Sequence, residues 1–320
     1  MAVLLMCAVF PLIWVGGLVT SYNAGMAVPD WPSTYGYNLF LYPWQTWIFG
    51  PWDLFIEHGH RLLGALTGLL TIGLAVVIYG CDGRKWMRWM GVLAIAGVVG
   101  QGVLGGMRVL MDQRSLAKLH GCSGPLFFAF SVSLVVLTSS WWRQAQPEKT
   151  FRGSTVWFAW LLVAASFGQL VLGANIRHIT SHVSHQVYAG YVTSHVTLAI
   201  LLLVMTGGFL AWICLIHRDV VWLIRRVALL LGLLGVQFGL GLATWLSKYG
   251  TPWASEWNVT LQASGWGAAM LATAHVAMGS LILALATSVA LRASRLGVGA
   301  SEITSTTVKP SARIEARVFA

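Results

Sequence analysis

Residues 62–80 read LLGALTGLLTIGLAVVIYG, a run of 19 residues without a charged side chain. A helix needs about 20 predominantly apolar residues to cross the hydrocarbon core of a bilayer, so this run is long enough to span a membrane. The rest of the chain is similar, since 57% of its 320 residues are hydrophobic and 9% are charged. Soluble domains carry about 25% charged residues. The composition therefore excludes a soluble enzyme, a disordered chain and a secreted disulfide scaffold, and it predicts an all-α integral membrane protein.

Charge-poor apolar windows recur along the chain and predict eight transmembrane helices. The predicted spans are residues 3–21, 60–80, 89–107, 119–141, 155–175, 189–215, 222–246 and 267–291. The first window has no Lys or Arg before its apolar run, so we expect a retained helix rather than a secretory signal peptide. The four cysteines include no Cys-x-x-Cys pair, which argues against a zinc site or a redox dithiol.

The Lys and Arg residues indicate how the spans are oriented. Of the 20, 14 lie around 80–88, 142–153 and 216–226 and in the C-terminal tail. Cytoplasmic loops carry the excess of positive residues, so we expect a multi-pass protein of the cell membrane with both termini in the cytoplasm. Loop 22–56 has several Trp, Tyr and Pro but no Lys or Arg. We expect it outside, flat on the membrane face, either as a lid over a site or as an ordinary aromatic belt.

The chain contains a weak internal repeat. QGVLGG at 101–106 ends the third predicted span, and QFGLGL at 237–242 ends the seventh. LAKLHGCSGPLFFAF at 116–130 has a counterpart in LATAHVAMGSLILAL at 271–285. Both longer phrases have a His followed four residues later by a small residue, which allows neighbouring helices to approach closely.

The repeat divides the chain into two four-helix units. We predict an N-terminal unit, residues 1–142 with the outer loop 22–56, and a C-terminal unit, residues 153–293. With an even number of spans in each unit, the two are parallel repeats about an axis along the membrane normal. Residues 294–320 are rich in Ser and Thr and are predicted to form a disordered cytoplasmic tail.

Four of the nine histidines lie inside predicted spans near their outer ends, one in each even-numbered span: His60, His120, His195 and His275. Ionisable residues at membrane depth are rare and usually functional. The small residue one turn later shares the helix face of each His, so each imidazole stands above a shallow groove. This arrangement suits a porphyrin held between two helices, and we predict that the four residues bind haem iron. A hydrogen bond to a neighbouring helix is the alternative for any one of them.

The other histidines are predicted to lie in loops or at helix ends. The outer boundary of the sixth span is blurred, so His185 is an alternative to His195 as its ligand. Outside the four ligands, we expect solvated side chains at His58, His178, His182, His185 and His217. No short-spaced set of His, Asp and Glu accompanies the intramembrane histidines, which makes zinc less suitable than haem.

Glu57 stands three residues before His60, so the two share a helix face. A carboxylate beside a haem ligand is able to orient the imidazole or to transfer protons. The alternative is a capping glutamate in the first helical turn, where negative charge is favoured. Arg61 and Arg108 are candidates to pair with haem propionates, and simple surface charge is the alternative for each.

Several phrases, in this order, resemble the haem A synthase family, and the likeness covers nearly all eight spans. They are GGLVTSYNAGMAVPDWPSTYG at 16–36, Glu-x-x-His-Arg at 57–61, QGVLGGMRV at 101–109, LHGC at 119–122 with LFFAF at 126–130, LGVQFGLGLATW at 234–245 and TAHVAMGSLILA at 273–284. Two features depart from the family. The first outer loop lacks the cysteine pair of some members, and YVTSHVTLA at 191–199 lacks an Arg after its His.

The resemblance implies a fold of two pseudo-symmetric four-helix bundles, each with a His pair. It implies that His60 and His120 hold haem O as substrate in the N-terminal unit. It also implies that His195 and His275 hold a haem b (iron) cofactor in the C-terminal unit. The reaction would convert a porphyrin methyl group to a formyl group by hydroxylation, for cytochrome oxidase assembly, with Glu57 needed for the chemistry.

The implied partners are haem O, membrane lipid, an unidentified electron donor and haem O synthase as a candidate supplier, with no nucleic acid. No Gly-rich nucleotide motif follows a predicted strand, so electrons must come from a partner. The main rival is a dihaem b-type membrane cytochrome that only passes electrons, using the same four histidines without Glu57. A transporter also fits eight spans, but the helices lack the matched mid-span Gly and Pro breaks expected of transporter sites.

Overall fold

The computed structural model describes residues 1–146, 153–179, 183–249 and 265–306. Eight of the helices in these ranges are long and apolar enough to cross a membrane, and the described residues contain no strand. The long helices are α1 (Ala2–Ser21), α3 (Trp52–Cys81), α4 (Lys85–Met111), α5 (Arg114–Thr138), α7 (Gly153–Arg177), α8 (His185–Ile216), α9 (Val221–Tyr249) and α10 (Trp266–Thr306). Helices satisfy their backbone hydrogen bonds internally, as a lipid environment requires. The predicted all-α membrane fold with eight spans is confirmed.

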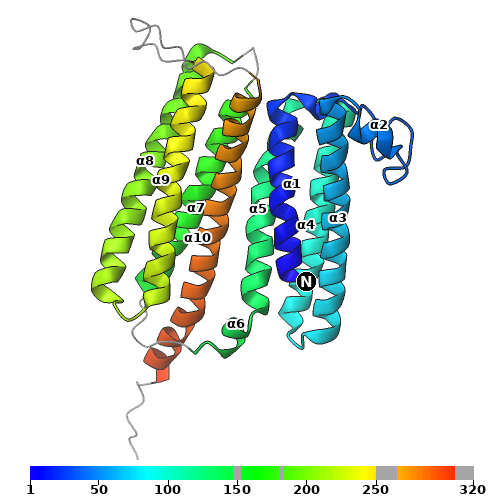
Figure 1. The fold of residues 1–320 in the computed structure, drawn as a ribbon. Helices are drawn as coiled ribbons and strands as arrows, with labels where there is room; N and C mark the ends of the chain where they lie inside the picture. Colours follow the sequence, from blue (N-terminus) through cyan, green and yellow to red (C-terminus); the bar gives the residue numbers. More distant parts are fainter. Residues whose placement is uncertain (147–152, 180–182, 250–264, 307–320) are drawn as a thin grey trace, which may run out of the picture.

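The helices form two groups of four. α1, α3, α4 and α5 pack together, as do α7, α8, α9 and α10 (Figure 1). The groups meet where α10 packs against α1 and α5. In their apolar windows α5 and α10 bury 50% and 44% of the residues, whereas α4, α7 and α9 bury 17%. α5 and α10 are therefore the central helices, and the outer helices leave most of their apolar surface for lipid.

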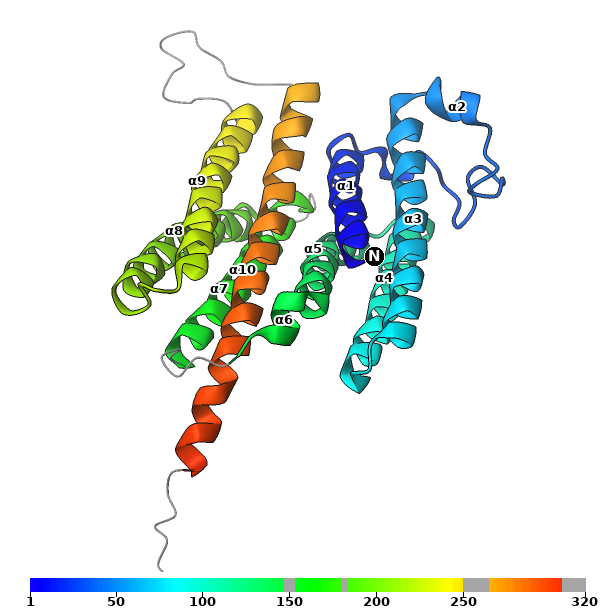
Figure 2. The same cartoon turned by 60° about the horizontal axis from the view of Figure 1, so that its bottom comes forward.

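The apolar cores follow this arrangement. The core of the first group includes Leu5, Met87 and Leu134, and Leu283 of α10 also belongs to it. The core of the second group includes Leu162, Phe209 and Leu223, with Ile282 of α10 beside them. α10 thus contributes neighbouring residues to both cores and holds the two groups together (Figure 2).

The even-numbered spans of the sequence, α3, α5, α8 and α10, all begin at the same end of the molecule, which we call the α2 end because it also carries the short helix α2 (Trp44–Ile48) (Figure 1). The N-terminus lies at the opposite end, which we call the Met1 end. Each histidine predicted as a ligand lies within the first eleven residues of its helix. All four are therefore near the α2 end.

Two segment boundaries differ from the sequence prediction. α3 begins at Trp52, eight residues before the predicted span, so the connecting loop is 22–51 and contains α2 and a short 3₁₀ helix, Ala24–Met26. α10 continues to Thr306 and includes the first part of the segment predicted as a disordered tail. Residues 291–296, Leu-Arg-Ala-Ser-Arg-Leu, are mostly good helix formers and extend the preceding span. Residues 307–320 lie outside the described ranges.

Candidate haem-binding sites

The four intramembrane histidines come together as two pairs, one in each group of helices. His60 of α3 faces His120 of α5, with ring centres 6.3 Å apart and ring planes at 87°. His195 of α8 faces His275 of α10, with ring centres 6.2 Å apart and planes at 70°. His185, the alternative ligand, is the exposed first residue of α8. His195 is thus the residue that the structure brings opposite His275.

Each of these rings packs against a glycine of a neighbouring helix. The glycine–histidine pairs are Gly16 with His60, Gly105 with His120, Gly173 with His195 and Gly241 with His275. A Cβ added at the glycine would lie 2.9, 3.2, 3.2 and 3.0 Å, in that order, from Cε1 of the histidine. Carbon atoms in ordinary contact are about 3.5–4.0 Å apart, so a larger residue would displace each ring. The same contact therefore sets the position of all four imidazoles.

The spacing of the pairs fits a single iron between two rings. An imidazole nitrogen binds a transition metal at about 2.0–2.1 Å and lies roughly 1.1 Å from its own ring centre, so two opposed ligands have centres roughly 6.2–6.4 Å apart. Both observed separations, 6.3 and 6.2 Å, agree. No group of three or more His, Cys, Asp or Glu in the described residues is arranged to hold a metal ion. A haem iron needs only two protein ligands because the porphyrin supplies the others.

The ring nitrogens support the same interpretation. Nδ1 of all four histidines is buried without a hydrogen-bond partner in the described structure. The backbone carbonyl one turn before each contacted glycine interacts with the ring, and these carbonyls belong to Leu12, Gln101, Gln169 and Gln237. A metal-binding histidine directs its second nitrogen at such an oxygen, and here a carbonyl lies beside each ring although Nδ1 forms no hydrogen bond with it.

Arg108 of α4 lies beside the first pair. Its charge reaches both His60 and His120, and it also interacts with Glu57. A Cβ on Gly25 would clash with Nη2 of Arg108, so only glycine lets the loop cover this guanidinium. Arg108 forms no salt bridge among the described residues. It is thus a half-buried cation available to an acidic group of a ligand.

Glu57 and Arg61 form a buried ion pair that also holds loop 22–51. Glu57 is 3% exposed. One of its carboxylate oxygens accepts a hydrogen bond from Nη2 of Arg61 at 2.8 Å, and the other accepts from the backbone N–H of Val28 at 3.1 Å. Arg61 donates further hydrogen bonds to the carbonyls of Val28, Asp30 and Ser33. Glu57 is therefore not an N-terminal cap, because its partners are the loop and the next turn of α3.

The expectation of solvated histidines was wrong at two positions. His58 is 2% exposed, its Nδ1 is hydrogen-bonded to Thr34 Oγ1 at 3.0 Å, and its ring packs against those of Tyr42 and Trp47. His217 is 3% exposed and hydrogen-bonded to Thr155. Their polar partners are distant in sequence, so the local pattern gave no sign of burial. His182 lies outside the described residues.

Hydrogen bonds within residues 27–36 hold loop 22–51 in a fixed turn beside the first group of helices. The Asp30 carboxylate accepts hydrogen bonds from Ser33, Tyr35 and Gly36, and the Tyr35 hydroxyl donates to the Ala27 carbonyl. Burial opposes ionisation of Asp30, but these hydrogen bonds outweigh it and lower the pKa of the carboxyl. Together with the Glu57–Arg61 pair, they fix the loop against α3.

Known proteins resemble parts of this chain, although no family model matches it. The "Heme A synthase" of Shouchella clausii (strain KSM-K16) is 28% identical over 51% of this chain and 53% of its own length. The "Heme A synthase" of Beijerinckia indica subsp. indica is 27% identical over 52% of this chain and 54% of its own length. The chain spans about half the length of the curated relatives it matches. These similarities support membership of the haem A synthase family.

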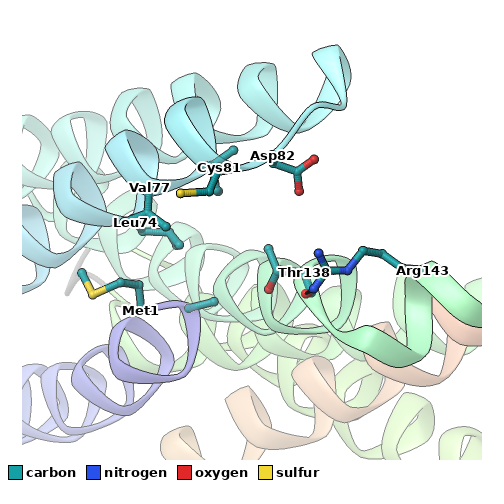
Figure 3. A pocket seen from close by; sticks show the side chains of 9 residues that line it. Met1, Leu74, Val77, Cys81, Asp82, Thr138 and Arg143 are labelled. Carbon is teal, nitrogen blue, oxygen red and sulfur yellow. Dashed lines mark hydrogen bonds between the residues drawn. The ribbon is translucent and has the colours of Figure 1, made fainter.

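Two cavities of this protein lie away from the His pairs. One, of about 210 Å³, is at the Met1 end between α1, α3 and α5. Its lining consists of Cys81, Asp82 and Arg143 together with several apolar side chains (Figure 3). The hydrogen bond from Arg84 lowers the pKa of Asp82 to about 2. The other, of about 380 Å³, is an apolar groove between α1, α2 and α3 lined by Trp47 and Trp52. Neither is lined by a histidine.

Sequence reasoning missed the four glycines that contact the histidine rings. A usable signal was present in three of the four cases, because Gln-x-x-x-Gly recurs at 101–105, 169–173 and 237–241. The repeat marks one carbonyl and the glycine one turn later. Gly16 has no such Gln, and its role depends on packing between α1 and α3.

Proposed function

We propose that this protein is a membrane oxidoreductase that converts a methyl group of haem O to the formyl group of haem A by hydroxylation. The observation that carries the proposal is the presence of two His pairs, each with the ring separation expected of two ligands on one iron. The similarity to two proteins named "Heme A synthase" supports a role in haem A synthesis. Haem iron, when bound, supplies the oxidative chemistry, and an electron donor outside the chain supplies the electrons.

The two pairs have different surroundings, which supports different roles for them. Glu57, Arg61 and Arg108 lie around the first pair, under the anchored loop 22–51. The residues of α8 that correspond to Glu57 and Arg61, at the same offsets from His195, are Val192 and Val196. Acid–base chemistry needs an ionisable group near the reacting atom. We therefore assign the substrate haem O to His60 and His120, and a resident haem b to His195 and His275.

Around the first pair, the protein's own groups have distinct tasks. His60 and His120 hold the substrate iron, and Gly16 and Gly105 fix the two rings. Arg108 binds an acidic group of the substrate. Arg61 holds the loop with both of its terminal nitrogens and keeps Glu57 in place. Glu57 would handle protons for the reaction, one helical turn from His60.

We also propose a location and an orientation for the protein in the membrane. The described helices support a multi-pass membrane protein, and the Lys and Arg distribution supports cytoplasmic termini, with the α2 end and the haem sites toward the outer face. A dihaem b-type cytochrome is the second candidate, favoured by the closely matched geometry of the two pairs.

The decisive experiment is extraction and mass analysis of the haems of protein purified from cells that also make haem O. The proposed function requires haem O or haem A beside haem b. Recovery of haem b alone, at two per chain, would establish the cytochrome instead.

Glu57→Gln tests the role of the carboxylate in the same preparations. The amide keeps the size of the side chain but does not ionise, so we expect normal haem content and little formyl product. Asp53→Asn is the matched control, because Asp53 is an exposed carboxylate one turn earlier on α3. Full product formation by Glu57→Gln would reject proton handling and leave Glu57 as an anchor of the loop.

A further inference from the structure

Arg177, the last residue of α7, lies directly above the second His pair. It follows Gly173 by four residues, so the two share a helix face. Gly173 touches the ring of His195. One helical turn rises 5.4 Å, so Arg177 stands about one turn nearer the α2 end than that contact. Its charge reaches His275 on the other side of the pair.

The guanidinium of Arg177 is held between the two groups of helices by neutral oxygens. Nη2 donates to the Gly17 carbonyl at 2.9 Å and to Ser21 Oγ at 2.8 Å, both on α1. Nη1 donates to the Ala272 carbonyl of α10 at 3.4 Å. No carboxylate in the described residues forms a salt bridge with it. Arg177 is half-buried, and a charge taken out of water is costly unless an opposite charge accompanies it.

The surroundings of Arg177 add positive charge rather than neutralise it. The next residue, His178, is close to Arg177, Arg108, Lys118 and Arg114, and burial together with these cations lowers its pKa to about 4. Lys118 and Arg114 donate to neutral oxygens, those of Asn175 and of Ile179. The α2 end between the two His pairs is therefore strongly cationic, which favours an anionic ligand.

The first site contains a comparable arrangement. Arg108 follows Gly105 by three residues, Gly105 touches the ring of His120, and Arg108 also lacks a salt bridge among the described residues. The two arginines are on non-equivalent helices, α4 and α7. Each nevertheless stands one turn toward the α2 end from a glycine–histidine contact.

We propose that Arg177 is a carboxylate-binding residue of the second site and pairs with a propionate of the haem held by His195 and His275. The proposal rests on the haem-binding role proposed above for that pair. A planar guanidinium suits a carboxylate because it donates two parallel hydrogen bonds. Through Gly17 and Ser21, the same side chain also connects haem binding in the second group to the packing of α1 in the first.

The test compares haem b with its dimethyl ester, whose propionates carry no charge. Full-length protein with His60→Ala and His120→Ala, made in haem-deficient cells, binds haem only at the second site. Affinity for each haem is measured by optical titration, and the ratio of the two affinities reports the propionate contact. Arg177→Gln is introduced into this background, with Ser21→Ala as the matched control that removes one hydrogen bond of Arg177 but no charge.

We expect Arg177→Gln to weaken binding of the free acid by about 10- to 100-fold, the contribution of a hydrogen bond to a charged group. Binding of the ester should change little, so the affinity ratio falls at least tenfold, and Ser21→Ala should keep the parent ratio. An unchanged ratio in Arg177→Gln, or an equal loss of affinity for both haems, would overturn the proposal. Failure of the parent protein to bind either haem would instead reject the second haem site itself.

Two further arms keep the result decisive. Arg177→Lys keeps the charge without the fork of two nitrogens, so we expect a reduced but measurable preference for the free acid. A full parental preference in Arg177→Lys would contradict the proposed contact, even if Arg177→Gln did not accumulate. A phospholipid phosphate is the other source of an anion. If Arg177→Gln lost bound phosphatidylglycerol while keeping the haem ratio, the residue would be a lipid site and the propionate proposal would fail.

Discussion

Gly241→Ala should remove the haem from the second site, although it adds a single methyl group. The new Cβ would lie 3.0 Å from Cε1 and 3.6 Å from Nδ1 of His275. Carbon contacts are ordinarily about 3.5–4.0 Å, so the ring must retreat by about 0.5–1.0 Å. Metal–ligand distances tolerate about 0.2 Å. On the proposed function, the displaced ring would therefore be unable to keep a bond to an iron shared with His195.

The energetic cost follows from the same contact. Overpacking of a well-packed site costs about 1–3 kcal/mol, which corresponds to a loss of about 5- to 150-fold in haem affinity. The assay is the haem content of purified protein together with its optical spectrum. A bis-histidine iron gives a low-spin spectrum, and loss of one ligand removes it.

Gly239→Ala is the matched control, because it lies two residues away on α9 and a Cβ there meets nothing within 4 Å. Replacing a helical glycine by alanine stabilises a helix by about 0.5–1 kcal/mol, so this variant should keep its haem and unfold at the same or a higher temperature. If Gly241→Ala kept as much low-spin haem as Gly239→Ala, the glycine contacts would not position the ligands, and the proposed role of all four would be wrong.

Three further predictions concern the loop, the pH dependence and the topology. Thr34→Val removes the hydrogen bond to buried His58, so loop 22–51 should be cleaved faster by protease than in Thr46→Val, whose side chain is exposed. Burial and the neighbouring cations lower the pKa of His178 in the folded state from its ordinary value of 6.5 to about 4, so unfolded chains bind more protons between these values. Thermal stability should therefore fall as the pH drops from 6.5 to 4, and His178→Gln should reduce that dependence. A reporter fused after residue 300 should be active only in its cytoplasmic form, and periplasmic activity would reverse the topology.

The sequence predicted the spans well because hydrophobic length is a local property. The windows missed the start of α3 because they stop at charged residues, and Asp53 and Glu57 precede the apolar run. Pro51 and the early Asp53 favour a helix start at Trp52. The charge of Glu57 is acceptable inside the helix because Arg61 and the loop neutralise it. Arg61 is only four residues away, but the loop contact at Val28 is 29 positions away and is not visible in a window.

The His pairs could be predicted as a set, since one histidine per even-numbered span is a pattern of sequence alone. Which ring faces which, and what holds each ring, depends on packing between helices. The choice between His185 and His195 illustrates this difference. Both are near the start of α8, and only the three-dimensional arrangement brings His195 opposite His275.

The two sites have similar histidine geometry but differ in the charged residues around them. The described part of the chain contains two salt bridges, and one of them, Glu57–Arg61, is beside the first His pair. Arg108 and Arg177 stand beside the two pairs without such partners. A site that offers only a cation suits the permanent binding of an acidic cofactor. A site that adds a buried carboxylate, under a loop fixed by that carboxylate, is equipped to exchange protons with what it binds. We therefore infer that the repeat provides two iron sites, and that the charged residues around the first make it the one where substrate reacts.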